Sequence, residues 1–272
     1  MQTISLNTGG EIPTIGFGTW KIRLNNKAET AVFEALAAGY RLIDTARIYG
    51  NEKGVGKAIR ESGVPRADIF VTTKLWNSDQ GYEKGLKAFD DSLKRLDLEY
   101  VDLYLIHWPV PVQRLESWRA LEEIYKSGRA KAIGVSNFTV PHLEELLSHL
   151  SIVPSVNQVE FHPYIYEDQK PLLEFCKQQG MIMEAYSPLA HGHNLGNRHI
   201  SQLADKYGKS NAQIILRWCL QHATVPLPKS SNAERIRENL DIFNFELTAA
   251  EMVQINSLSD GTRTCWDPTE IQ

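Results

Sequence analysis

Eight short runs of β-branched and other apolar residues alternate with amphipathic helical stretches along most of the chain. Each run has the length of a buried strand, and each intervening helix could return the chain to the same end of a parallel sheet. Because the repeat count is eight, we expect an α/β fold of the (β/α)8 TIM-barrel type rather than an open doubly wound sheet. The expected strands cover residues 15–18, 41–44, 69–74, 101–107, 130–135, 156–159, 181–185 and 224–226.

Turn and capping residues mark where these elements begin and end. Thr8-Gly9-Gly10 lies at the centre of residues 4–13, which predicts an N-terminal β-hairpin that could cover the bottom of the barrel. A capping-box pattern precedes the helix after residue 210 and, at residues 248–251, predicts an extra C-terminal helix. No linker or change of composition divides the 272 residues, so residues 1–272 are expected to form one domain.

Composition limits the classes of partner. The formal net charge of -4 and the absence of basic clusters argue against nucleic acid, and no apolar run approaches the roughly 20 residues that cross a bilayer. The N-terminus lacks the pattern of a signal peptide, and three widely spaced cysteines indicate reduced thiols. We therefore expect a cytoplasmic protein in which Cys176 and Cys219 are buried, whereas Cys265 could be exposed and reactive.

Polar residues collect at the C-terminal ends of the expected strands. In a barrel these ends form the face that carries the active site, so side chains from different strands would converge there. The residues in question are Asp44, Lys74, His107, Ser136, Gln158, Tyr186 and Lys229.

Four of the residues near these strand ends are suited to protonating a carbonyl oxygen. The phenol of Tyr49 is a weak acid, and an ammonium group nearby is expected to lower its pKa. Lys74 could supply that charge and Asp44 could hold the lysine, while His107 could donate a hydrogen bond to the oxygen. Each residue alone could be structural, since a buried ion pair or a buried histidine needs no catalytic role.

Tryptophans follow three of the same strands. Trp20, Trp76 and Trp108 come after the first, third and fourth expected strands. Burial in the core is the usual place of tryptophan, but at this face they are expected to wall a substrate cleft.

Other motifs do not support a different chemistry. The glycines of residues 50–58 have the wrong spacing for a phosphate loop, and no G-x-G-x-x-G follows the first strand. His191 and His193 lack a carboxylate or cysteine close in sequence, so no metal site is expected.

A series of short motifs resembles the aldo-keto reductases, in particular small microbial members such as 2,5-diketo-D-gluconate reductases and the trypanosomatid prostaglandin F synthase. The resemblance covers nearly the whole chain and keeps the order of the motifs. They are GFGTWK (residues 16–21), DTARIYGNE (44–52), TTKLW (72–76), LIHWP (105–109), GVSNF (134–138), QVEFHP (158–163), YSPL (186–189) and PKSSNAERIRENL (228–240).

The resemblance implies a catalytic tetrad, a cofactor site and a carbonyl site. The implied catalytic residues are Asp44, Tyr49, Lys74 and His107. NADPH would be held at its nicotinamide by Ser136, Asn137, Gln158 and Tyr186, at its 2′-phosphate by Lys229, Ser230 and Arg235, near its adenine by Glu238 and Asn239, and elsewhere by Thr19, Trp20, Asp44, Ser187 and Leu189. The carbonyl substrate would contact Trp20, Tyr49, Trp76, His107 and Trp108.

Two cations and a hydroxyl around a phosphate dianion favour NADPH over NADH. The loops at residues 110–115 and 190–198 are shorter than in larger family members, which predicts a more open pocket. The tail at residues 262–272, with Trp266, is the part that shapes specificity in the family. The resemblance also implies a monomer.

The expected function is therefore NADPH-dependent reduction of aldehydes or ketones, with α-dicarbonyls, keto-sugars or small aldehydes as substrates. One alternative is a lyase on the same barrel in which Lys74 forms a Schiff base. The other is a barrel that binds NADPH as a sensor and catalyses nothing. Pairing of Lys74 with Asp44 would disfavour the lyase, because a paired lysine stays charged.

Overall fold

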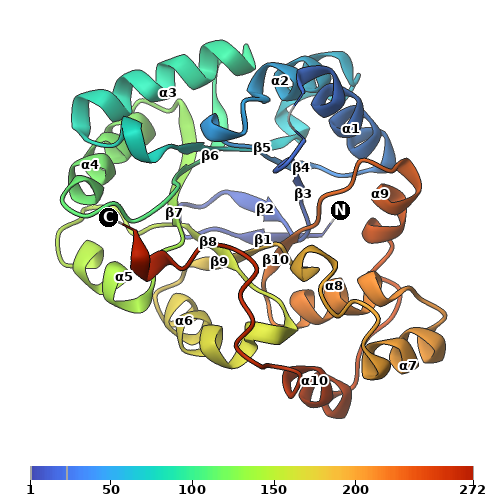
Figure 1. The fold of residues 1–272 in the computed structure, drawn as a ribbon. Helices are drawn as coiled ribbons and strands as arrows, with labels where there is room; N and C mark the ends of the chain where they lie inside the picture. The colour runs from blue at the N-terminus through green and yellow to red at the C-terminus, as the bar shows by residue number, and fades with distance from the viewer. Residues whose placement is uncertain (1, 23, 272) are drawn as a thin grey trace.

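Eight parallel strands form the barrel in the computed structural model, which describes residues 2–22 and 24–271 (Figure 1). Each expected strand overlaps an observed one, so the predicted fold class is confirmed. The order is sequential from β3 to β10, and backbone hydrogen bonds of 3.0 Å from Gly16 to Pro226 and from Gly18 to Pro228 join the two ends of the sheet. The strands are β3 (Phe17–Gly18), β4 (Leu42–Asp44), β5 (Phe70–Leu75), β6 (Val101–Ile106), β7 (Ala130–Ser136), β8 (Val156–Glu160), β9 (Ile182–Tyr186) and β10 (Val225–Leu227).

Helices surround the strands and cover their outer face (Figure 1). They are α1 (Asn25–Ala38), α2 (Glu52–Glu61), α3 (Tyr82–Leu96), α4 (Gln113–Lys126), α5 (Val140–Leu147), α6 (Tyr166–Gln178), α7 (Arg198–Tyr207), α8 (Asn211–Gln221), α9 (Ala233–Leu240) and α10 (Ala249–Asn256). Short 3-10 helices are η1 (Arg47–Tyr49), η2 (Arg66–Asp68), η3 (Asn77–Asp79), η4 (Pro163–Ile165), η5 (Ala190–Gly192) and η6 (Pro268–Glu270). The capping boxes expected before α8 and α10 are both present.

The glycines that resemble a phosphate loop have a packing role instead. Gly54 and Gly56 lie inside α2, and a Cβ atom at either position would overlap the backbone, at Asn25 for Gly54 and at Leu96 for Gly56. Their absent side chains let α2 approach its neighbours closely.

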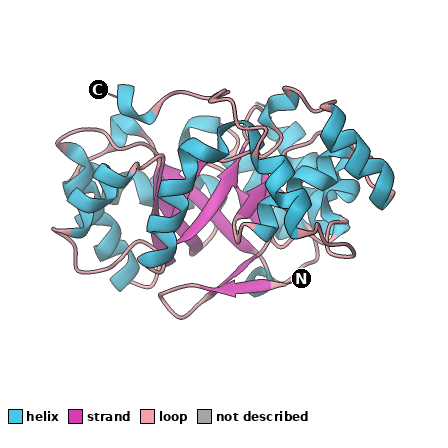
Figure 2. Ribbon diagram, turned by 90° about the horizontal axis from the view of Figure 1, so that it is seen from below, coloured by secondary structure: helices cyan, strands magenta, loops and turns pink. Residues whose placement is uncertain are grey.

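The N-terminal hairpin closes the bottom of the barrel, as predicted. Strands β1 (Thr3–Ser5) and β2 (Glu11–Pro13) pair antiparallel and lie below the parallel strands (Figure 2). Leu6 and Ile12 from the hairpin are buried with Leu42, Leu103 and Leu105, whose side chains fill the barrel interior. This apolar plug fills the bottom of the barrel interior.

The chain after α10 returns across the face opposite the hairpin (Figure 1). The tail passes over the ends of the strands, and η6 lies beside α5 (Figure 1). Among the described residues, no helix is long and apolar enough to span a bilayer.

Candidate active site

A cavity of about 1220 Å³ opens at the carboxyl ends of the barrel strands. It gathers nearly all of the residues expected at the site, from elements spread across the whole chain. They are Trp20, Asp44, Tyr49, Trp76, His107, Trp108, Ser136, Asn137, Gln158, Tyr186, Ser187, Leu189, Lys229, Ser230, Arg235, Glu238 and Asn239. Two expected residues do not line the cavity: Lys74 lies behind Asp44, and Thr19 is buried with its hydroxyl donating to the Asp44 carbonyl at 2.9 Å.

An ion pair lies beneath the cavity floor. Lys74 Nζ is 2.7 and 2.6 Å from the two carboxylate oxygens of Asp44 and donates to the Thr45 carbonyl at 3.0 Å. It is also 3.4 Å from the phenolic oxygen of Tyr49, and the lysine side chain is fully buried. The lysine therefore contacts Tyr49 but not the open space where a substrate could bind.

The effect of this ion pair on Tyr49 differs from the expectation. Burial, with smaller contributions from the charges of Asp44 and Cys265, holds the pKa of Tyr49 well above its usual value. The prediction of a lowered Tyr49 pKa is wrong, because burial disfavours the phenolate by more than the Lys74 charge, which Asp44 at 2.6 Å from the lysine offsets, can stabilise it. Tyr49 consequently keeps its proton at neutral pH, as a proton donor must.

His107 continues the inner face of β6 into the cavity. Burial and the charge of Lys74 hold the pKa of His107 well below its usual value, so the ring is neutral at neutral pH. The ring lies edge-on to Tyr49 and Trp76, with centroid distances of 5.8 and 5.3 Å. A neutral imidazole has one N–H, which is enough for one hydrogen bond to a substrate oxygen.

Polar side chains on the next strands form a connected wall. Tyr186 donates its hydroxyl to Asn137 Oδ1 at 2.6 Å, and Asn137 donates to the His107 carbonyl at 2.9 Å. Ser136 donates to the Gln158 carbonyl at 2.8 Å. These bonds fix the orientation of an amide-rich surface beside Tyr49 and His107.

Glu184 joins this network from inside the barrel. The sequence did not predict it as a site residue, because it lies within an apolar strand and belongs to no recognisable motif. Gln158 Nε2 donates to Asp44 Oδ2 at 2.9 Å and to Glu184 Oε2 at 2.8 Å. Burial and then the charge of Asp44 raise the pKa of Glu184 to about 8, although Gln158 and Lys74 act in the opposite direction. Glu184 therefore holds a proton at neutral pH.

This raised pKa predicts a pH-dependent difference between the protein and a Glu184→Gln variant. Between pH 4.5 and about 8 the unfolded chain loses the Glu184 proton while the folded chain keeps it, so folding stability falls as pH rises. The variant has no such group. We expect its free energy of unfolding, relative to that of the unaltered protein, to increase from pH 5 to pH 8 in urea titrations. An equal difference at both pH values would contradict the raised pKa.

Aromatic rings enclose the cavity near Tyr49. Trp20 lies 4.8 Å from Tyr49 by ring centroids, and Trp108 lies 5.8 Å from Trp266 of the tail. Trp266 is 66% exposed and Trp108 is 6% exposed, so the tail residue forms the outer layer of this wall. The expectation that Trp20, Trp76 and Trp108 line a cleft agrees with their positions.

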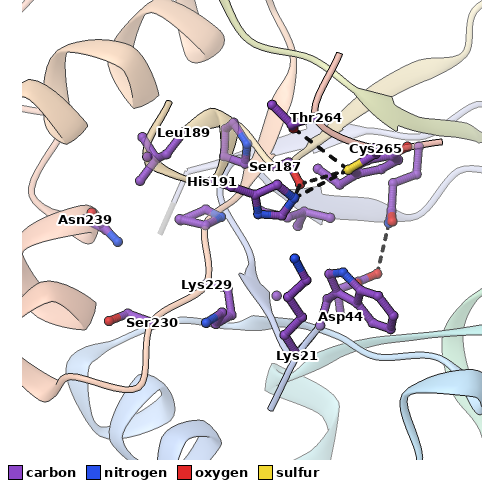
Figure 3. Close-up of a pocket in the computed structure, with 18 of the residues that line it drawn as sticks. Lys21, Asp44, Ser187, Leu189, His191, Lys229, Ser230, Asn239, Thr264 and Cys265 are labelled. Carbon is purple, nitrogen blue, oxygen red and sulfur yellow. Dashed lines mark hydrogen bonds between the residues drawn. The ribbon is translucent and has the colours of Figure 1, made fainter. Parts of the chain in front are cut away.

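The opposite end of the cavity is cationic. Figure 3 shows Ser230, Lys229 and Asn239 toward one end and Asp44 with Cys265 toward the other. Arg235 lines this end from the first turn of α9, whose N-cap is Asn232. Such a set of donors suits a phosphate group.

Several lining residues were not expected from the sequence. Lys21 and His191 face each other across the middle of the cavity (Figure 3). The loop after β9 also contributes Leu195 and Gly196, and the tail contributes Arg263 and others. Lys21 follows β3 closely, whereas the others reach the cavity through the path of two loops that no local pattern specifies.

The tail is held over the cavity by Glu160. Its Oε1 accepts from the Thr264 amide at 2.7 Å, from the Thr264 hydroxyl at 2.5 Å and from His162 at 3.0 Å. The next residue, Cys265, is half-buried. Its Sγ atom lies 3.6 Å from Ser187 Oγ and 3.6 Å from His191 Nε2 (Figure 3). Burial and the charge of Glu160 raise the pKa of Cys265, which disfavours the reactive thiolate considered above. Cys176 and Cys219 are buried, as predicted.

Comparison with known proteins agrees with this geometry. A sequence model described as the aldo/keto reductase family matches residues 14–260. A glyoxal reductase of Bacillus subtilis (strain 168) is 52% identical over 270 residues, which are 99% of this chain and 97% of that protein. A 9,11-endoperoxide prostaglandin H2 reductase of Trypanosoma cruzi (strain CL Brener) is 48% identical over 97% of this chain and 94% of its own length. A crystal structure of a Gox0644 mutant in complex with NADPH has a TM-score of 0.94 and 41% identity, covering 100% of this chain and 98% of that one.

Proposed function

The chain belongs to the aldo/keto reductase family, and from this premise we propose that it reduces aldehydes and ketones to alcohols with NADPH, using Tyr49 as the proton donor. The observation that carries the proposal is the placement of a protonated Tyr49 and a neutral His107 on one wall of a cavity that continues to a cationic end. The first group can give a proton and the second can hold an oxygen.

The residues of the cavity fit NADPH. Lys229, Ser230 and Arg235 provide two cations and a hydroxyl for a 2′-phosphate, and the cavity is continuous from there to Tyr49. The related Gox0644 structure contains NADPH, which supports the same cofactor here. When bound, NADPH would supply the hydride for the carbonyl carbon.

The chain's own residues would handle the oxygen and its proton. His107, neutral and lining the cavity, would donate a hydrogen bond that orients the carbonyl oxygen and stabilises negative charge on it. Tyr49 would transfer its hydroxyl proton to that oxygen as the charge develops. Lys74, 3.4 Å from the phenolic oxygen, would stabilise the tyrosinate left behind, and Asp44 would keep the lysine in position.

The geometry argues against the two alternatives. A Schiff-base lysine must reach the substrate, whereas Lys74 is fully buried and bonded to both oxygens of Asp44. A sensor needs no proton donor at the end of its cofactor groove, but Tyr49 and His107 line the cavity here.

The substrate class is tested with a panel of carbonyl compounds. The name of the Bacillus subtilis relative makes α-dicarbonyls such as glyoxal the first choice, followed by aldoses, keto acids and quinones. We expect the protein to consume NADPH with at least one α-dicarbonyl, measured as a loss of NADPH absorbance. Tight NADPH binding without turnover on any compound would favour the sensor and contradict the proposal.

The proposed phosphate site predicts a change of cofactor preference. We expect Arg235→Ala to weaken NADPH binding by at least about tenfold, the effect of a charge-assisted hydrogen bond, and to leave NADH binding nearly unchanged. Dissociation constants for both cofactors, from quenching of tryptophan fluorescence, measure this. Arg237→Ala is the matched control, because Arg237 lies on the same helix but pairs with Glu34 at 3.2 Å outside the cavity. Equal losses for NADPH and NADH would refute the role of Arg235.

A further inference from the structure

Glu184 is a carboxyl group that the proposed proton transfer does not use. It lies in the middle of β9, in register with Gln158 on β8 and Val225 on β10, and it is fully buried. A carboxyl group in a barrel interior opposes folding unless a neighbour is hydrogen-bonded to it. Its partner here is Gln158, through the bond of 2.8 Å to Oε2.

Both amide hydrogens of Gln158 are directed at carboxyl groups. An amide nitrogen carries two hydrogens, and Nε2 of Gln158 donates to Asp44 as well as to Glu184. Asp44 can only accept in this contact, because its carboxylate forms the ion pair with Lys74. If the amide turned over, its oxygen would face the Asp44 carboxylate, which can only accept. Its Oε1 atom is thereby left for the cavity that Gln158 lines.

We propose that Glu184 is a positioning residue for the cofactor: together with Asp44 it fixes the amide of Gln158 so that Oε1 accepts a hydrogen bond from the amide N–H of the nicotinamide carboxamide. The inference rests on the proposed NADPH-dependent function and deepens it. Glu184 does not line the cavity, so it would act only through Gln158.

The charged groups around Glu184 leave this role intact at neutral pH. Asp44 on β4 raises the pKa of Glu184 and Lys74 on β5 lowers it. Gln158 on β8 donates the hydrogen bond to Glu184. A carboxyl group can accept at Oε2 whether or not Oε1 carries a proton. The arrangement therefore depends on the presence of an acceptor at residue 184 rather than on its charge.

The test compares two cofactors that differ at the carboxamide. In the reduced 3-acetylpyridine analogue of NADPH a methyl group replaces the amide nitrogen, so nothing can donate to Gln158. Tryptophan-fluorescence titrations without substrate would give both dissociation constants. We expect the unaltered protein to bind NADPH about fivefold more tightly than the analogue, the effect of one hydrogen bond.

Two variants separate positioning from bulk structure. Glu184→Met fills similar space without an acceptor, and we expect it to weaken NADPH binding so that the ratio of the two constants falls toward one. Glu184→Gln keeps an acceptor oxygen and should keep the ratio. Glu184→Leu serves the same purpose if circular dichroism shows that the methionine variant is unfolded.

The outcomes are distinct. A ratio near one in the unaltered protein, an unchanged ratio in the methionine or leucine variant, or equal weakening of both cofactors would overturn the role of Glu184. If the unaltered protein fails to bind NADPH at all, the proposed function falls together with the inference. Normal NADPH binding with an unchanged ratio would overturn the inference alone.

Discussion

Replacing Tyr49 with Phe is expected to reduce the turnover number for carbonyl reduction by between about 100-fold and 10,000-fold, the range that general acid catalysis contributes. The reason is that the hydroxyl supplies the proton, while the ring supplies the packing against Trp20 at 4.8 Å. NADPH binding should change by less than about twofold, since that hydroxyl is needed only when the proton moves. Steady-state kinetics and a binding titration measure the two effects separately.

Tyr40→Phe is the matched control for this loss. Tyr40 is fully buried, and its hydroxyl has no hydrogen-bond partner among residues 2–22 and 24–271. We expect wild-type kinetics from this variant. If Tyr49→Phe retains most of the turnover, another group is the acid; if it loses NADPH binding equally, the loss reflects a damaged pocket.

A second large effect is expected from Lys74→Met. Removing the lysine leaves Asp44 buried without its counter-ion, which costs about 3–5 kcal/mol of folding stability for a buried pair broken from one side. It also removes the cation 3.4 Å from the Tyr49 oxygen, so turnover should fall with stability. Urea unfolding gives the first quantity and steady-state kinetics the second.

The double variant Asp44→Asn with Lys74→Met tests the cause of the instability. With no charge left to bury, we expect it to recover a substantial part of the lost stability but none of the turnover. Lys57→Met is the surface control, because the Lys57 pair with Glu29 is solvent-exposed and should matter little. A double variant as unstable as Lys74→Met would show that packing, not the unpaired charge, governs the loss.

The position of the catalytic candidates was predictable from local pattern. Strand length and the end of each apolar run place Asp44, Lys74 and His107 at strand ends, and parallel pairing brings those ends to one face. The motif resemblance added the cofactor residues. Closure of the barrel then needs no further information, because eight repeats and a right-handed strand twist suffice.

Other properties of the site depend on distances between segments far apart in the sequence. The raised pKa of Tyr49 is one, since it comes from burial and from the charges of Asp44 and Cys265, which meet Tyr49 only in the folded chain. The tail is another, because Thr264 meets Glu160 across 104 positions of sequence.

The sequence by itself determined the barrel, the face that carries the site and the identity of the polar groups on it, because these follow from periodicity and from the order of strands. Only the tertiary structure decided the protonation of Tyr49 and His107, the contact of Glu184 with Gln158 and the placement of Trp266 over Trp108. Those features depend on desolvation and on contacts across the fold, and both are properties of three-dimensional proximity that no local stretch of sequence encodes.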